Sequence, residues 1–153
     1  MNRSELQQRI SSVKKELEKL ENELKETPVS IAEAKAGDTL NDGCIVIERY
    51  SDYLLIASPV EVSCHWTRQF KPLFEQLEKE GFIPSQWYVP SKEELQLAYK
   101  NCRQLFSPTF YWSSTEYSSA RACSVNFING IANGYFKTGT DCVRAFRRYP
   151  LDS

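Results

Sequence analysis

Residues 1–27 differ from the rest of this chain, because their apolar residues are spaced alternately by three and four positions. These apolar residues are Leu6, Ile10, Val13, Leu17, Leu20 and Leu24, and Lys, Glu, Gln, Arg and Ser fill most of the positions between them. This repeat predicts an amphipathic helix over residues 1–27, with Leu6, Val13 and Leu20 at heptad position d and Ile10, Leu17 and Leu24 at position a. Thr27-Pro28 ends the helix, because proline cannot continue it. One such helix cannot bury its own stripe, so an intermolecular coiled coil is predicted.

The oligomeric state of this coiled coil is open. Valine at one d position disfavours a strict dimer and admits a trimer. In a parallel homomer, Arg9 would face Lys14 and Glu16 would face Glu21, and like charges repel. The alternatives are therefore a weak homomer, docking on another protein, and a helix folded back on its own domain.

Composition narrows the class of the remaining chain. The 153 residues are 41% apolar and 12% aromatic, which suits one domain with a real core and an appendage. The formal net charge of -1 argues against nucleic-acid binding, which normally needs a basic face. No apolar run approaches the roughly 20 residues of a membrane-spanning helix, so no membrane insertion is predicted. The charged amino terminus does not resemble a signal peptide, and no secretory route is expected.

The cysteines do not follow a metal-binding pattern. They are Cys44, Cys64, Cys102, Cys123 and Cys142. No close pair occurs among them, and the single histidine, His65, follows Cys64 directly, where adjacent strand residues point to opposite faces. Neither a metal, a cofactor nor a catalytic dyad is predicted. Reduced, mostly buried thiols are expected, and one disulfide is the alternative.

Local signals predict an α+β domain over residues 39–153, entered through a linker at residues 28–38. Runs at 44–49 and 53–57 predict a hairpin, and Pro72 to Glu80 predicts a helix that stops at Gly81. A second helix begins at Ser91, where Glu94 completes a capping box.

Strands are expected after Pro108, at 110–113, 122–128, 134–137 and 142–147. Asn129-Gly130 and Asn133-Gly134 are hairpin dipeptides. The predicted architecture is therefore two helices plus an antiparallel β-meander.

Three segments, in order, carry a resemblance to a known family. They are Trp87-Tyr88-Val89-Pro90-Ser91-Lys92-Glu93-Glu94-Leu95, then Tyr111-Trp112-Ser113-Ser114-Thr115-Glu116, then Phe127 to Gly130 with Val143-Arg144-Ala145-Phe146-Arg147. Together they resemble the carboxy-terminal domain family of Legionella collagen-like adhesins, over about residues 37–149. The opening hairpin, Gly43 to Ala57, also resembles that family.

The resemblance implies a C-type-lectin-like fold and a role in surface recognition. The family occurs in bacterial surface proteins and in phage tail proteins, and a coiled coil without a signal peptide is typical of the phage arrangement. A non-enzymatic phage tail or fibre protein of the virion is therefore expected. The alternatives are a structural or decorating virion protein, a bacterial cell-surface adhesin, and an enzyme of the related sulfatase-modifying type. The copper-binding cysteine pair of those enzymes has no counterpart here, and Tyr88 replaces the family's arginine.

The candidate residues fall into two groups. Trp87, Trp112 and Arg144 are expected to be structural, with Arg144 paired to Glu116. The remainder are expected to bind a host-surface glycan or protein, because Tyr and Asn combine contact area with adaptable hydrogen bonds. These ligand-binding candidates are Tyr117, Arg121, Asn126, Asn129, Asn133, Tyr135 and Lys137. The alternative is that they form ordinary hairpin turns.

Overall fold

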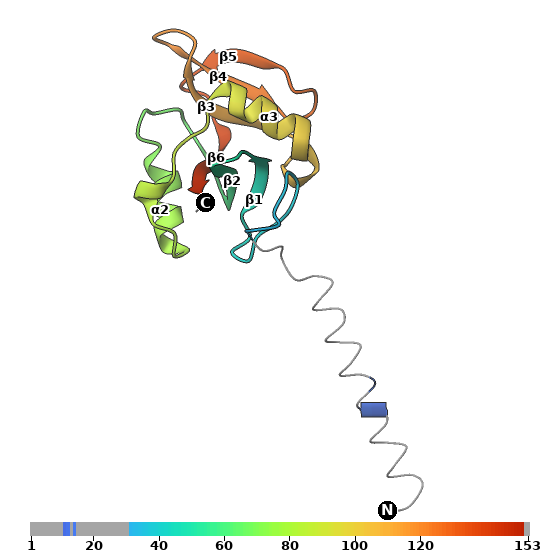
Figure 1. Ribbon diagram of the computed structural model, residues 1–153. Helices are drawn as coiled ribbons and strands as arrows, with labels where there is room; N and C mark the ends of the chain where they lie inside the picture. The colour runs from blue at the N-terminus through green and yellow to red at the C-terminus, as the bar shows by residue number, and fades with distance from the viewer. Residues whose placement is uncertain (1–10, 13, 15–30, 152–153) are drawn as a thin grey trace, which may run out of the picture.

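The computed structural model describes residues 11, 12, 14 and 31–151. Nearly all of the predicted coiled coil, residues 1–27, lies outside these residues and stays a prediction. The described part has an α+β fold, in which two α-helices accompany a six-stranded mixed sheet (Figure 1). Its elements are β1 (Ile45–Arg49), β2 (Tyr53–Cys64), α2 (Lys71–Lys79), the 3-10 helix η1 (Pro84–Gln86), α3 (Lys92–Cys102), the 3-10 helix η2 (Arg103–Leu105), β3 (Phe110–Glu116), β4 (Arg121–Asn126), β5 (Ala132–Phe136) and β6 (Asp141–Pro150).

The predicted amino-terminal hairpin is confirmed, since β1 and β2 pair antiparallel. However, β2 runs seven residues past the expected end at Ala57, to Cys64. Its register against β6 shifts between Ala57 and Glu61, around Pro59. Proline has no N–H to give to a neighbouring strand, so the pairing is interrupted there and then resumes.

Both predicted helices are present, and their ends follow the local chemistry. Pro72 lies in the first turn of α2, where its missing N–H costs nothing. At α3 the capping box is confirmed: Glu94 N donates to Ser91 Oγ (3.2 Å), and Ser91 N donates to Glu94 Oε1 (3.1 Å).

The predicted meander is wrong for the last strand. β3, β4 and β5 do form an antiparallel meander, but β6 lies between β2 and β3, antiparallel to β2 and parallel to β3. Val143, Ala145 and Phe146 of β6 are fully buried. A strand that is apolar on both faces needs a covered, central position, and the edge of a meander does not provide one.

Asn133-Gly134 is not a turn, contrary to the prediction. Both residues lie within β5, and the turn between β4 and β5 is made at residues 127–131, where Gly130 has a φ of 77°. The ring of Tyr117 lies against Gly134, so a Cβ at this position would be 2.5 Å from Tyr117 Cγ. Gly134 therefore serves a close side-chain approach rather than a turn.

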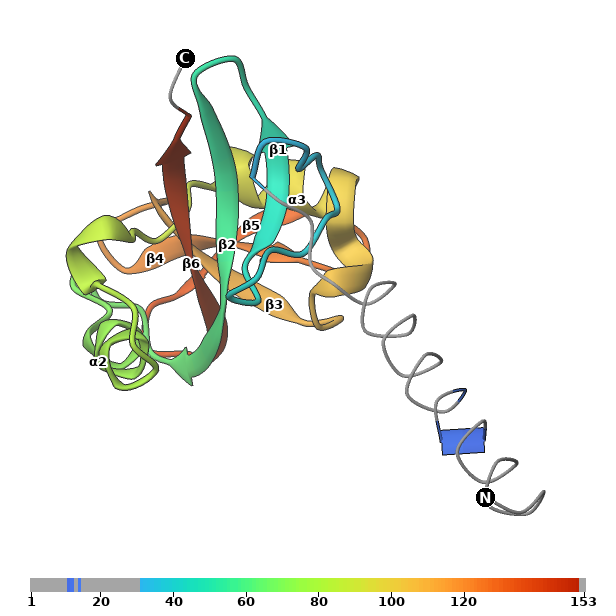
Figure 2. The same cartoon turned by 60° about the horizontal axis from the view of Figure 1, so that its bottom comes forward.

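Apolar side chains cover both faces of the sheet. Leu54 and Ile56 of β2 pack with Leu73 and Leu77 of α2, and the alternate residues of β2 face the opposite way. On that second face, Leu55 packs in the cluster that contains α3. Figures 1 and 2 show α2 and α3 on opposite sides of the sheet. The unbroken apolar run at 54–57 is thus a central strand buried on both sides.

Candidate functional site

The three motif segments meet in space and hold one another in place. Tyr88 and Phe146 exchange two backbone hydrogen bonds, with N–O distances of 2.9 and 2.8 Å. Ser114 N donates to Pro90 O (2.8 Å), and Lys92 N donates to Thr115 Oγ1 (3.1 Å). These bonds join the start of α3 to β3, and the segment before α3 to β6. Ser114 and Thr115 of the second motif therefore serve to build this joint.

Tyr88, which replaces the arginine of the family motif, keeps a link to an acidic group. Its Oη donates a hydrogen bond to Glu94 Oε2 (2.6 Å), and burial raises the pKa of the phenol. Glu94 thus serves both the capping box and Tyr88.

The residues expected to be structural lie in the interior. Trp112 is fully buried and Trp87 is 6% exposed, and Trp112 Nε1 donates to Cys64 O (2.9 Å). Arg144 is also buried, but its acid partner is Glu61 (3.2 Å) rather than the expected Glu116. Glu61 comes from the extension of β2 that the sequence did not predict.

Glu116 instead links two exposed segments. Its Oε1 lies 3.1 Å from Arg68 Nε, and its Oε2 lies 3.3 Å from Lys137 Nζ. The hydrogen bond from Lys137 lowers the pKa of Glu116, and the charge of Arg68 acts in the same direction. Lys137 Nζ also donates to Ser119 O and lies 4.5 Å from the centre of the Trp66 ring. This predicted ligand-binding residue is therefore engaged within the protein.

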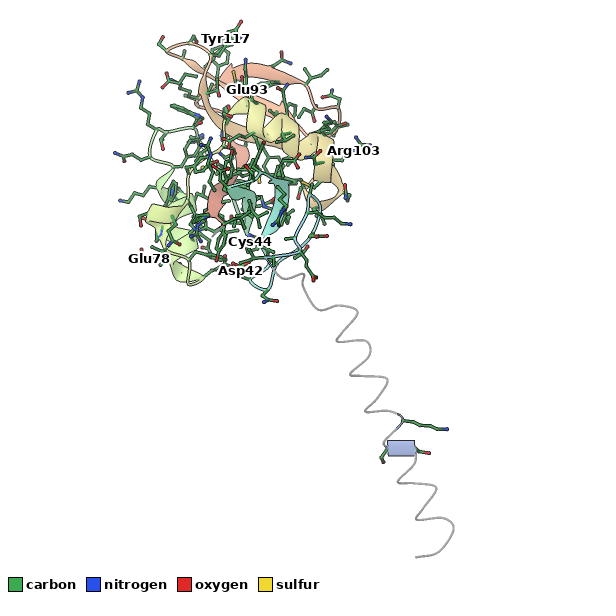
Figure 3. The ribbon with its side chains drawn as sticks, viewed as in Figure 1. Asp42, Cys44, Glu78, Glu93, Arg103 and Tyr117 are labelled. Carbon is green, nitrogen blue, oxygen red and sulfur yellow. The ribbon has the colours of Figure 1, made fainter. Side chains whose placement is uncertain are left out.

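Two other predicted residues present side chains at one end of the sheet. Tyr117 is 66% exposed in the turn after β3, at the end of the molecule remote from Asp42 (Figure 3). Its ring lies on Gly134. On the same side of β5, the Arg121 guanidinium lies 4.3 Å from the centre of the Phe136 ring, which is 57% exposed. We refer to Tyr117, Arg121, Gly134 and Phe136 as the β3–β5 end.

The two asparagines of the next turn serve the backbone. Asn126 Oδ1 accepts from Ile128 N (2.9 Å), and Asn129 Oδ1 accepts from Ile131 N (3.0 Å). The ring of Tyr99, from α3, lies against Gly130 and braces the same turn. The side-chain oxygens of both asparagines thus accept hydrogen bonds that stabilise the turn. Ile128 and Ile131 of the same turn are more than half exposed.

Asn133 and Tyr135 point to the other side of β5, because side chains alternate along a strand. Tyr135 packs against Phe110, with ring centres 5.1 Å apart, and against the core cluster that contains α2. Asn133 is exposed. The seven predicted residues are therefore divided between two faces of the sheet and do not form one continuous patch.

A pocket that the sequence did not indicate lies between the start of α2, the segment before α3, and β3. Its volume is about 570 Å³. It is lined by Trp66, Arg68, Phe70, Phe74, Trp87, Tyr88, Val89, Ser114 and Glu116, and we call it the α2–β3 pocket. The one sign of this pocket in the sequence is the large number of aromatic residues between 66 and 88, which are more than the short helix α2 can bury.

Several buried thiols of the protein are poorly suited to nucleophilic chemistry. All five cysteines are free, and burial raises the pKa of Cys102 to about 11 and that of Cys142 to about 12. The reactive thiolate is therefore scarce near neutral pH. His65 is exposed, and its Nδ1 lies 3.1 Å from Gly139 O.

The part of the chain that the structure describes offers neither a metal-binding cluster nor a membrane-spanning helix. No group of three or more His, Cys, Asp or Glu side chains there is arranged to hold a metal ion. No helix there is long and apolar enough to cross a membrane.

The described part is thus an α+β domain with an aromatic-lined pocket on one side of the sheet and exposed aromatic side chains at the β3–β5 end. No protein-family model matches the chain, and no curated protein matches it either.

Proposed function

We propose that this protein recognises a surface as part of a phage tail or fibre. A coiled coil over residues 1–27 assembles copies or docks on another virion protein, and a C-type-lectin-like domain presents the β3–β5 end to a host-surface glycan or protein. The α+β architecture supports this fold. The contacts among the three motif segments also support this fold. Motif residues such as Pro90 and Thr115 accept hydrogen bonds that join these segments.

The observation that carries the proposal is the prearranged, exposed aromatic surface. Tyr117 is held on Gly134, and Phe136 is covered on one side by Arg121, yet each residue is more than half exposed. An aromatic residue that is ordered before binding loses little conformational freedom on contact, so more of its contact energy appears as affinity.

Binding rather than catalysis is supported by how the ionisable groups are used. Glu61 is paired with Arg144 and accepts a hydrogen bond from Tyr111 Oη (2.6 Å). Glu116 is held by Lys137 and Arg68. The pKa of Glu116 is lowered by these partners, whereas a general acid or base at neutral pH needs a raised pKa.

The test is a binding assay on the full chain against a panel of bacterial cells and an array of glycans. Tyr117→Ala removes the exposed ring, and Gly134→Ala displaces it, because the new Cβ meets Tyr117. Each substitution is expected to weaken binding by about tenfold, as for a central aromatic contact. Tyr50→Ala, which removes an exposed tyrosine from the β1–β2 turn, is the control and should bind normally. Binding that survives both changes at the β3–β5 end, or no binding to any cell or glycan, contradicts the proposal.

A further inference from the structure

We propose that the α2–β3 pocket receives an apolar side chain, aliphatic or aromatic, from a protein partner. This is a second contact, distinct from the β3–β5 end, and it rests on the proposed function only in that the chain binds a partner. The pocket lies on the α2 side of the sheet, whereas Tyr117 and Phe136 lie on the side of α3.

The walls of the pocket are largely aromatic. Trp66 and Phe70 meet edge to face, with ring centres 5.7 Å apart, and Phe74, Trp87 and Val89 complete the apolar lining. The volume of about 570 Å³ lies within the usual range of ligand pockets, roughly 300–1,000 Å³. Apolar surface of this kind is stabilised by an apolar occupant that displaces water.

The two charged residues that line the pocket pair with each other. Arg68 and Glu116 form an ion pair 3.1 Å apart, and the Arg68 side chain is 78% exposed. The second carboxylate oxygen of Glu116 is held by Lys137. Because Glu116 is neutralised by these partners, it offers no free charge to a cationic ligand. An apolar interior beside a paired, solvent-exposed polar rim is the usual anatomy of a protein–protein contact.

One residue of the pocket wall has a strained backbone. Phe70 has φ 42° and ψ 46°, and it is the only non-glycine residue with positive φ in the described part of the chain. The left-handed conformation is unfavourable for a residue with a bulky side chain, because its Cβ lies too close to the following carbonyl oxygen. A hydrogen bond from Phe70 N to Thr67 Oγ1 (3.0 Å) supports the conformation, and the Phe70 ring is 1% exposed in the pocket wall. Such strain persists where the surrounding structure enforces it, and it concentrates at binding sites.

One polar group in the wall has no partner. Trp87 Nε1 is buried and finds no acceptor among the residues that the structure describes. An unpaired buried donor is unfavourable, because it has lost its hydrogen bond to water. Trp66 and Trp112, in contrast, donate to Ser113 O and Cys64 O. Trp87 is therefore the lining tryptophan whose indole N–H keeps an unused hydrogen bond.

The three tryptophans of the chain allow a direct test by NMR, because each gives one indole N–H signal. The full chain is titrated with N-acetyl-leucine amide, N-acetyl-phenylalanine amide and methyl α-glucoside. We expect the two amides to shift the Trp87 signal in a saturable manner and to leave the Trp112 signal unchanged. No shift with either amide would overturn the proposal. An equal, saturable shift with the glucoside would overturn the choice of a protein side chain and assign the pocket to sugars.

Variants locate the binding within the pocket. Ser114→Phe places a ring in the pocket from an exposed position on β3, and it should weaken amide binding by about tenfold. Ser63→Phe, at an exposed position of β2 outside the pocket, is the matched control and should bind as the unmodified chain does. Equal binding by both variants would overturn the assignment. If Ser114→Phe does not fold, Phe74→Ala, which removes one wall, replaces it with the same expectation.

The two proposals fail separately. Amide binding in the pocket does not involve Tyr117, so Tyr117→Ala should leave the Trp87 titration unchanged while it weakens binding to cells. Loss of both readouts in this one variant would show that the pocket is not an independent contact.

Discussion

At the scale of single residues, the contribution of a charged side chain to stability depends on how deeply it is buried. Arg144 is 5% exposed, and its guanidinium donates to Leu105 O (3.1 Å) and Ser58 O, pairs with Glu61, and lies 4.5 Å from the centre of the Phe106 ring. Arg68 makes an ion pair of similar length at the surface. The two arginines form a natural comparison between a buried and an exposed cation.

Arg144→Ala is therefore expected to destabilise the protein by about 3–5 kcal/mol, because it leaves the Glu61 charge and two carbonyl groups without their partner. Arg68→Ala should cost less than about 1 kcal/mol, as exposed ion pairs do. Urea unfolding at one fixed protein concentration measures both values. Similar midpoints for the two variants would contradict this account of Arg144.

Glu116 permits a prediction about pH. Its pKa is lowered from 4.5, first by the hydrogen bond from Lys137. A carboxyl group with a depressed pKa in the folded state contributes stability that is fully present above its ordinary pKa and is lost as the pH falls through the lower value. Lys137→Met should therefore raise the pKa of Glu116, and Arg68→Ala should raise it less. Carbon-13 titration of the Glu116 carboxyl group checks this order, and the reverse order would contradict it.

At the scale of elements, α3 depends on its first turn. Ser91 and Glu94 exchange two hydrogen bonds there, and Glu94 also holds Tyr88. Ser91→Ala should destabilise the protein by about 1 kcal/mol, because one helix N–H loses its acceptor. Ser51→Ala, at an exposed position between β1 and β2, is the control and should change stability by less than about 0.5 kcal/mol. Thermal unfolding followed by circular dichroism distinguishes the two, and an unaltered Ser91→Ala protein would contradict the role of the cap.

The elements also show which signals are readable in the sequence. Ser91 and Glu94 are three residues apart, and the capping box they predict is present because it depends on local chemistry alone. The place of β6 is different, because it depends on how strands distant in the chain compete for a buried position. Asn133-Gly134 has the composition of a turn, but the neighbouring ring of Tyr117 determines its role.

The same limit applies to the candidate site. The sequence identified the residue types of the turns, and Tyr117 is exposed there. It could not show that Asn126 and Asn129 would be used by the backbone, or that alternation would turn Tyr135 away from Arg121. The α2–β3 pocket was missed because its walls come from three segments that only the folded chain brings together.

At the scale of the whole molecule, the function proposed here depends on copy number. Weak contacts at each domain gain apparent affinity when several domains are linked, because later contacts form at a high effective concentration. The heptad stripe of residues 1–27 would supply that linkage in the full chain.

Leu17→Ser together with Leu20→Ser is expected to lower the native mass to that of a monomer, since both positions lie in the predicted apolar seam. The same variant should keep the Trp87 titration of the pocket, which belongs to the domain. Native mass spectrometry measures the first outcome, and an unchanged mass would contradict the coiled coil. Glu23→Ser, outside the stripe, is the control.

The central position of β6 in the sheet affects how the protein folds. β1 and β2 form one half of the sheet, β3 to β5 form the other, and residues 141–150 are the strand that joins them. While the chain folds, the inner edges of β2 and β3 stay unpaired until β6 inserts between them. A folding intermediate that has not yet placed β6 therefore exposes two strand edges at once, and such edges promote aggregation.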